Sequence, residues 1–387
     1  MGRKARIAGI LFLLGALGVV LTWSFYGGLR EAPSTSQTLP SRVRTPTQSS
    51  SPSPAPPTIP TEPLSTLTSP PAFRAEAIRV VAEKPLTRDG RFAGSTFGVA
   101  WSPGGDKIAF ARVTGQFITS SSGFTSQTSL WIAHLTDTSY RKISDIGQSP
   151  AWSPDGTHVA FVAWLAQGRS EVRVFDFESG KTETVVEQGI AVSWLRDKIV
   201  VTMKDGHVRA YDLATATVVP VTDYTVSADG PNTLAASPSG EYMALVHHRE
   251  VWLISPHNPS PAIKLTDRFE NTFGSLVWAP TGDKIAYVAD KAIWVTTLGP
   301  QIHSQRIYIW PERGHPWALT WSPDGNVLAF HGPEGVSLVN ADGSGFRTLV
   351  PYGVSPEKSY LFPAWSPDGT MMAVEREKNL WFLLLAP

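Results

Sequence analysis

The side chains that could carry out chemistry are dispersed along this chain. Nine histidines are present, and only His247 and His248 are adjacent. Because neighbouring residues on a strand point to opposite faces, this pair is not expected to share a metal ion. The motifs Gly-x-Ser-x-Gly and His-Glu-x-x-His do not occur, and the chain has no cysteine. The usual signatures of hydrolase nucleophiles, zinc proteases and thiol chemistry are therefore missing. We predict no catalytic residue, no metal site and no cofactor.

Two local patterns have a chemical interpretation and a structural one. Ser179-Gly180-Lys181-Thr182 resembles the end of a phosphate-binding loop, but Phe175 stands where that loop requires glycine. This pattern therefore predicts a polar turn. Aspartate precedes glycine at Asp155, Asp324 and Asp368. Such pairs favour tight turns, and calcium binding is the second interpretation.

Aromatic and charged residues concentrate in four segments, each of which precedes a repeated strand. Arginine and large aromatic residues dominate the energetics of binding surfaces. The candidate binding residues in these segments are Tyr224, Asp229, Arg268, Glu270, Arg313, His315, Trp317 and Tyr360. A longer stretch around residues 115–129 adds Phe117 and Phe124. These residues form one site only if the fold brings their segments together. The alternative is that they belong to ordinary polar loops.

A sequence repeat after residue 75 provides the elements that would position these segments. It reads AWSPDGTHVAF at residues 151–161 and TWSPDGNVLAF at residues 320–330. The anchor positions of its seven copies are Trp101, Trp152, Trp194, Ala236, Trp278, Trp321 and Trp365. The spacings between them are 51, 42, 42, 42, 43 and 44 residues. Seven units of this length indicate a propeller or a solenoid.

The content of each unit favours the propeller. A tryptophan-led strand, a Ser-Pro-Asp-Gly turn and further short apolar strands give four antiparallel strands per unit. We therefore predict an all-β, seven-bladed propeller, with six blades as the alternative if the Trp194 unit is an excursion. The last unit ends after three strands, and Ile78–Val81 resembles a fourth strand. This N-terminal strand is expected to pair with the last blade and close the ring.

The repeated residues have structural roles of their own. In the turn, proline presets φ, aspartate accepts hydrogen bonds from backbone amides, and glycine takes a positive φ. The turn should join the innermost strand of a blade to the second strand. Each repeat tryptophan should fill the space between two neighbouring blades. Structural use of these tryptophans is favoured over stacking on a ligand.

The W-S-P-D-G-x-x-I/V-A-F pattern, together with Ala341-Asp342-Gly343-Ser344-Gly345, resembles the WD40-like (PD40) repeat of TolB-like β-propellers. The resemblance extends from Ile78 to the end of the chain. It implies an exported propeller with six or seven blades that serves as a protein-binding platform. Similar propellers lie beside peptidase domains, and a few are polysaccharide lyases. The chain departs from TolB because no α/β domain precedes the repeats, so the TolB role with a Pal-like lipoprotein is not expected.

The N-terminal part has a different character. Arg3, Lys4 and Arg6 precede an uncharged stretch from Ile7 to Tyr26, whose 20 residues match the thickness of a bilayer as a helix. We predict a cytoplasmic tip and a transmembrane signal anchor in residues 1–30. Cleavage near Gly27-Gly28, which would give a secreted protein, is the alternative. Residues 31–72 are rich in proline, serine and threonine and should form a disordered linker. Residues 73–387 then form the propeller, outside the cytoplasm.

Composition and charge narrow the function. Lysine plus arginine and aspartate plus glutamate both total 33, so the chain lacks the basic excess of a nucleic-acid-binding protein. The leading hypothesis is a monomeric, membrane-tethered scaffold that binds an envelope protein, peptide or glycan. The alternatives are a metal-dependent polysaccharide lyase or hydrolase at the channel mouth, and a purely structural part of an envelope complex.

Overall fold

The computed structural model describes residues 72–87, 96–120, 123–137, 139–222, 225, 234–256, 258–267, 269–270, 272–311, 317–352 and 361–386. Nearly all regular structure within these ranges is β-strand, and the short 3-10 helix η2 (Ala166–Gly168) is the exception. The predicted anchor (7–26) and linker (31–72) lie outside the described residues, apart from residue 72. Within the described ranges, no helix has the length and apolar character that a bilayer span requires.

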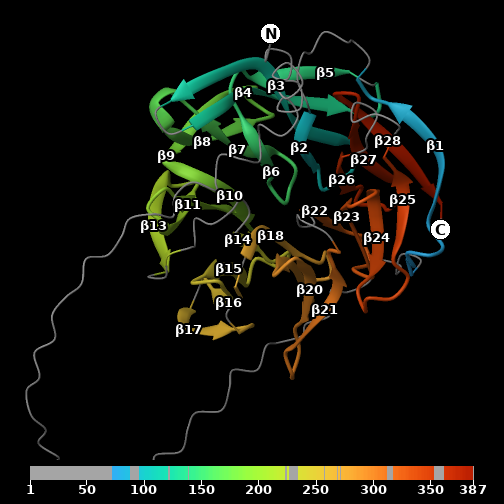
Figure 1. Cartoon of the computed structure of the whole chain (residues 1–387). Helices are drawn as coiled ribbons and strands as arrows, with labels where there is room; N and C mark the ends of the chain where they lie inside the picture. The colour runs from blue at the N-terminus through green and yellow to red at the C-terminus, as the bar shows by residue number, and fades with distance from the viewer. Residues whose placement is uncertain are drawn as a thin grey trace, which may run out of the picture. The chain divides into compact units, whose positions relative to one another are not determined.

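Seven antiparallel sheets of four strands each follow one another along the chain, as predicted. We number them blades 1 to 7 in chain order; Figure 1 shows them arranged in a ring around a centre. Blades 1 to 3 consist of β2 (Thr96–Trp101), β3 (Lys107–Ser120), β4 (Gly123–His134), β5 (Tyr140–Ser144), β6 (Gln148–Trp152), β7 (His158–Trp164), β8 (Ser170–Asp176), β9 (Thr182–Glu187), β10 (Gly189–Leu195), β11 (Lys198–Met203), β12 (Val208–Asp212) and β13 (Thr217–Thr222).

The remaining blades repeat this plan. Blades 4 to 7 consist of β14 (Leu234–Ala236), β15 (Met243–His247), β16 (Glu250–Ser255), β17 (Asn258–Lys264), β18 (Thr272–Trp278), β19 (Lys284–Ala289), β20 (Ala292–Thr297), β21 (His303–Ile309), β22 (Trp317–Trp321), β23 (Val327–Gly332), β24 (Gly335–Asn340), β25 (Arg347–Pro351), β26 (Leu361–Trp365), β27 (Met371–Arg376), β28 (Asn379–Ala386) and β1 (Arg79–Pro85). The Trp194 unit forms blade 3, so the six-bladed alternative is excluded.

The first strand of the fold closes the ring. β1 pairs with β28 in the antiparallel register that joins Arg79 to Ala386 and Pro85 to Trp381. In Figure 1, the blue strand β1 accordingly lies beside the red blade 7. Blade 7 thus combines the two ends of the described chain, which confirms the predicted closure and leaves no open end to the array of blades.

The repeat tryptophans join neighbouring blades. In five of the six, indole Nε1 donates a hydrogen bond to the carbonyl that precedes the anchor residue of the previous blade. The bonds are Trp101 to Ala364 (3.0 Å), Trp152 to Ala100 (3.0 Å), Trp194 to Ala151 (2.9 Å), Trp278 to Ala235 (2.9 Å) and Trp321 to Val277 (3.3 Å). Trp365 instead bonds to the carbonyl of Gly369 in its own turn (3.4 Å). Buried apolar clusters fill the same seams between blades.

A short segment before β1 forms a latch under blades 6 and 7. Phe73 is buried against Trp365, with ring centroids 5.8 Å apart, and its amide donates to Asp324 (2.7 Å). The amide of Ala75 donates to the side chain of Asn340 (2.8 Å). Gly369 has φ of 76°, and any Cβ there would lie 2.4 Å from the Phe73 ring. Glycine is therefore required both by the turn and by the latch.

The strand order gives the propeller two different ends. The turns between first and second strands and between third and fourth strands lie at one end, which we name the turn end. The hairpins between second and third strands and the segments that lead into the next blade lie at the other, which we name the loop end. The latch enters at the turn end, because Phe73 contacts the turns that hold Asp324 and Gly369.

Candidate functional site

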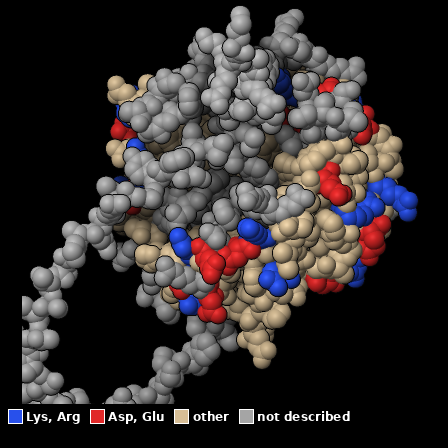
Figure 2. All heavy atoms as spheres, viewed as in Figure 1, with Lys and Arg blue, Asp and Glu red and all other residues tan. Residues whose placement is uncertain are grey.

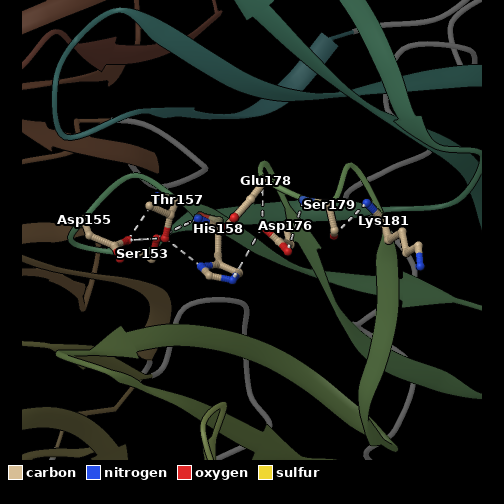
Figure 3. Close-up of polar contacts among 8 residues, drawn as sticks. All are labelled: Ser153, Asp155, Thr157, His158, Asp176, Glu178, Ser179 and Lys181. Carbon is tan, nitrogen blue, oxygen red and sulfur yellow. Dashed lines mark hydrogen bonds and ion pairs between the residues drawn. The ribbon is translucent and has the colours of Figure 1, made fainter.

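At the turn end, polar side chains form hydrogen bonds within their own turns. In blade 2, Asp155 accepts hydrogen bonds from the amide (3.0 Å) and hydroxyl (2.7 Å) of Thr157, and Ser153 Oγ accepts one from the amide of His158 (2.9 Å). Figure 3 shows this network and the neighbouring turn around Asp176. The Ser153 hydroxyl, followed by the Thr157 amide, holds the pKa of Asp155 at about 2. These aspartates therefore act as turn formers, as predicted.

The pattern that resembles a phosphate-binding loop is also an ordinary turn. Residues 177–181 connect β8 to β9, and Asp176 accepts a hydrogen bond from the amide of Glu178 (2.8 Å). The amide of Gly180 donates to the carbonyl of Asp176 (2.9 Å), and Gly180 has φ of 67°. With its amides occupied by the turn, the segment follows the structural interpretation.

Two of the eight candidate binding residues fall within the described residues. Glu270 is exposed. Trp317 is the first residue of β22, and its backbone pairs with His331. Tyr224, Asp229, Arg268, Arg313, His315 and Tyr360 lie outside the described residues. The long hairpin of β3 and β4 extends at the same end and pairs as far as Ser120 and Gly123.

At the loop end of three blades, the backbone of an aromatic residue is hydrogen-bonded to the hairpin of the same blade. The backbone amides of Phe269, Trp310 and Tyr352 donate to the carbonyls of Arg249 (2.9 Å), Lys291 (2.7 Å) and Glu334 (2.7 Å), in blades 4, 5 and 6. Phe269 is buried, and its ring lies 5.8 Å from that of Tyr287. The points from which the loops depart are therefore fixed, which favours a preorganised binding surface.

The innermost strands of four consecutive blades are bulged near the loop end. Gly98, Ser149, Ala318 and Phe362 lie three residues before the repeat tryptophan and have φ of 52–58°. The register of each strand shifts at that position. A Cβ on Gly98 would lie 3.4 Å from the amide nitrogen of Ser149, so bulges of adjacent blades touch. Three of the four residues are not glycine, and left-handed conformations of such residues are associated with functional sites.

Charged side chains are buried next to these bulges. Arg112 on β3 is 1% exposed, and Glu375 on β27 is 3% exposed. Side chains two residues apart on a strand point to the same face, so Arg112 shares a face with Phe110 and Glu375 shares one with Ala373. Both faces line the seam between blades 7 and 1. Both residues have interaction partners, as burial of a charge requires. The loop end thus has a polar layer where the middle of the seam is apolar.

A histidine–tyrosine pair occupies the corresponding position in blade 6. His331 Nε2 contacts the hydroxyl of Tyr352, which also donates to the carbonyl of Gly332 (2.7 Å). Burial lowers the pKa of His331 to about 4 and raises the pKa of Tyr352 to about 12. Both side chains are therefore neutral near pH 7, and the pair holds Tyr352 against the hairpin of blade 6.

Lowering the pH should destabilise the fold, because His331 stays neutral in the folded protein. The unfolded chain binds a proton as the pH falls below 6.5, whereas folded His331 resists protonation down to about pH 4. The free energy of unfolding should therefore decrease by up to about 3 kcal/mol across this window. His331→Gln should remove that part of the slope, as measured by urea unfolding between pH 7.5 and 4. Identical pH profiles of the two proteins would contradict the assignment.

The adjacent histidines differ from expectation. The ring centroids of His247 and His248 lie 4.0 Å apart, because His248 occupies a hairpin turn with φ of 50° and does not continue the strand. The alternation argument for opposite faces was therefore wrong. Among the described residues, no group of three histidine, aspartate or glutamate side chains is arranged to hold a metal ion.

The charges at the surface are mixed in sign. Figure 2 shows acidic and basic side chains gathered together on one face, next to residues drawn in grey. Near the loop end of blade 4, Lys264 Nζ lies 3.2 Å from Glu250 and 3.9 Å from Asp267. Acidic and basic side chains thus lie within ion-pair distance of one another at this surface.

No protein-family model and no curated protein sequence matches this chain. Solved structures match its fold. The β-propeller domain of Cps50 (Swd1) from Myceliophteria thermophila has a TM-score of 0.59 at 14% identity, over 78% of this chain and 99% of that one. Oligogalacturonate lyase in complex with manganese has a TM-score of 0.56 at 13% identity, over 79% and 93%. TolB from Acinetobacter baumannii has a TM-score of 0.47 at 20% identity, over 72% and 67%. At these identities the likeness establishes the propeller fold alone.

Proposed function

We propose that this protein is a membrane-tethered, extracytoplasmic propeller that binds a protein, peptide or glycan of the cell envelope through its loop end. The contrast between the two ends supports this most strongly. At the turn end, carboxylates and hydroxyls form hydrogen bonds within their own turns, as Asp155 does with Thr157. At the loop end, the backbone is fixed at Phe269, Trp310 and Tyr352, which in the sequence belong to or precede the segments rich in arginine and aromatic residues.

The position of the N-terminal segment is consistent with this orientation. Residues 73–78 enter the fold at the turn end, beside Asp324 and Asn340. The first described residues of the propeller thus lie at the end opposite the loop end.

Substitution of two loop-end residues should weaken this binding. Arg313→Ala combined with Trp317→Ala removes an arginine and an indole, the residue types that contribute most at interfaces, so affinity should fall about tenfold or more. The assay captures the binding component from native membranes with the full-length protein and then measures its affinity after purification. Arg313→Ala alone serves as the variant that leaves strand β22 intact. Unchanged affinity in both variants would place the site elsewhere.

A further inference from the structure

Three hairpins at the loop end carry charged residues where glycine would be expected. His248-Arg249, Asp290-Lys291 and Glu377-Lys378 form two-residue turns in blades 4, 5 and 7. All six residues have φ between 49° and 66°. Positive φ at both positions defines a type I′ turn, for which Asn-Gly is strongly favoured because a Cβ is unfavourable there. A basic residue occupies the second position in all three turns.

Two of the three basic side chains have no polar partner within the part of the chain that the structure describes. Arg249 and Lys291 are exposed, and their side chains form no hydrogen bond or ion pair with any other described residue. The turn in blade 7 differs, because Glu377 lies 3.9 Å from Arg376 and Lys378 has a partner. Among the described residues, no polar contact of the basic side chain therefore offsets the unfavourable backbone of the first two turns.

The same two turns are held rigidly in place. The carbonyls of Arg249 and Lys291 accept the hydrogen bonds from Phe269 and Trp310 described above. Phe269 in turn packs against Trp294, with ring centroids 5.8 Å apart. The two cations are thus presented from fixed backbone positions on adjacent blades, which reduces the entropy lost when a ligand binds them.

The chemistry around the turns favours a carboxylate-bearing polypeptide as the ligand. The neighbouring acid Glu250 is already bound by Lys264 (3.2 Å) and by Trp252 Nε1 (3.1 Å). Phe269 is 8% exposed, so the described surface offers fixed cations here and little aromatic face on which a sugar could stack. A chain with spaced carboxylates and its own backbone donors suits this arrangement better than a glycan does.

We propose that Arg249 and Lys291 are contact residues for an acidic polypeptide segment of the partner. This inference rests on the proposed binding function of the loop end, and it names the chemical class of the ligand. The two residues retain an unfavourable turn conformation because their cationic side chains contact the partner.

The test uses the full-length protein and poly-L-glutamate as the probe. Arg249→Gly with Lys291→Gly keeps the backbone geometry and removes both cations, so affinity at low salt should fall roughly fivefold, as expected for two exposed ion pairs. Lys378→Gly, the matched control in blade 7, should bind as the native protein does. Glycine relieves the turn in every variant, so each melting temperature should stay the same or rise by about 2 °C. Arg249→Lys with Lys291→Arg should retain binding.

Three outcomes would overturn the inference. Poly-L-glutamate does not bind, or it binds the double glycine variant as tightly as the native protein, or polygalacturonate is bound in preference. If the component captured from membranes binds the double glycine variant normally but not the Arg313→Ala, Trp317→Ala variant, the proposed function stands without this inference. If neither pair of substitutions affects that component, the loop end is not the binding surface.

Discussion

Trp152→Ala is expected to lower the free energy of unfolding by about 3–5 kcal/mol, the range for removing a buried tryptophan. The side chain is 8% exposed and lies in the seam between blades 1 and 2. It stacks on Phe177 at 5.2 Å and bonds to the carbonyl of Ala100 in the preceding blade. Its loss removes both packing and a link between blades. Urea unfolding, followed by circular dichroism, measures the change.

Trp152→Phe separates the two contributions. It keeps most of the aromatic area and removes the Nε1 hydrogen bond, so a loss of about 1 kcal/mol from that bond is expected, together with part of the packing term. Ala236 shows that one blade tolerates a small residue at this position; there, Arg196 reaches across from blade 3 and donates to the carbonyl of Ser239 (2.9 Å). If Trp152→Ala loses less than 1 kcal/mol, the tryptophans do not hold the seams together.

Phe73→Ala is expected to lower the free energy of unfolding by about 3–4 kcal/mol. The ring is buried under blades 6 and 7 and contacts Trp365, so its removal leaves a cavity where the N-terminal segment meets the closing blade. The substitution should also increase the hydrogen exchange of β1 amides, because the latch holds the start of that strand. Denaturant unfolding and exchange measured by mass spectrometry provide the two readouts.

The adjacent residue is the matched control. Arg74 lies 3.9 Å from Asp342, and both side chains are about 60% exposed. An exposed ion pair contributes little, so Arg74→Ala should change stability by less than about 0.5 kcal/mol. Equal effects of Phe73→Ala and Arg74→Ala would show that the latch does not stabilise the ring.

The repeat allowed the architecture to be predicted from the sequence. Seven copies of one pattern fix the blade number, the position of Trp101 and its equivalents, and the pairing of β1 with β28, because each copy repeats the same local interactions. Turn residues such as Asp155 and Gly156 have strong intrinsic preferences, so their roles also follow from residue type alone. Local preference and global fold agree at these positions.

The candidate site was less predictable because it depends on positions that differ between blades. The same kind of backbone hydrogen bond is formed by three different residue types, at Phe269, Trp310 and Tyr352. Arg112 and Glu375 face the same seam only because the ring closes between blades 7 and 1. An alignment of the units would have marked Glu375, since the equivalent residues of other blades include Val162 and Val246. The left-handed turn at Arg249 has no signal in the sequence, because Asn-Gly is absent there.

We propose that the loop end, and not the turn end, binds the envelope component. The most direct test measures the affinity of the captured component for two double variants side by side. One is Arg313→Ala with Trp317→Ala at the loop end; the other is Glu178→Ala with Lys181→Ala, two exposed residues at the turn end of blade 2. We expect a loss of about tenfold or more for the first variant and none for the second. A loss confined to the turn-end variant would show that the turn end is the binding surface.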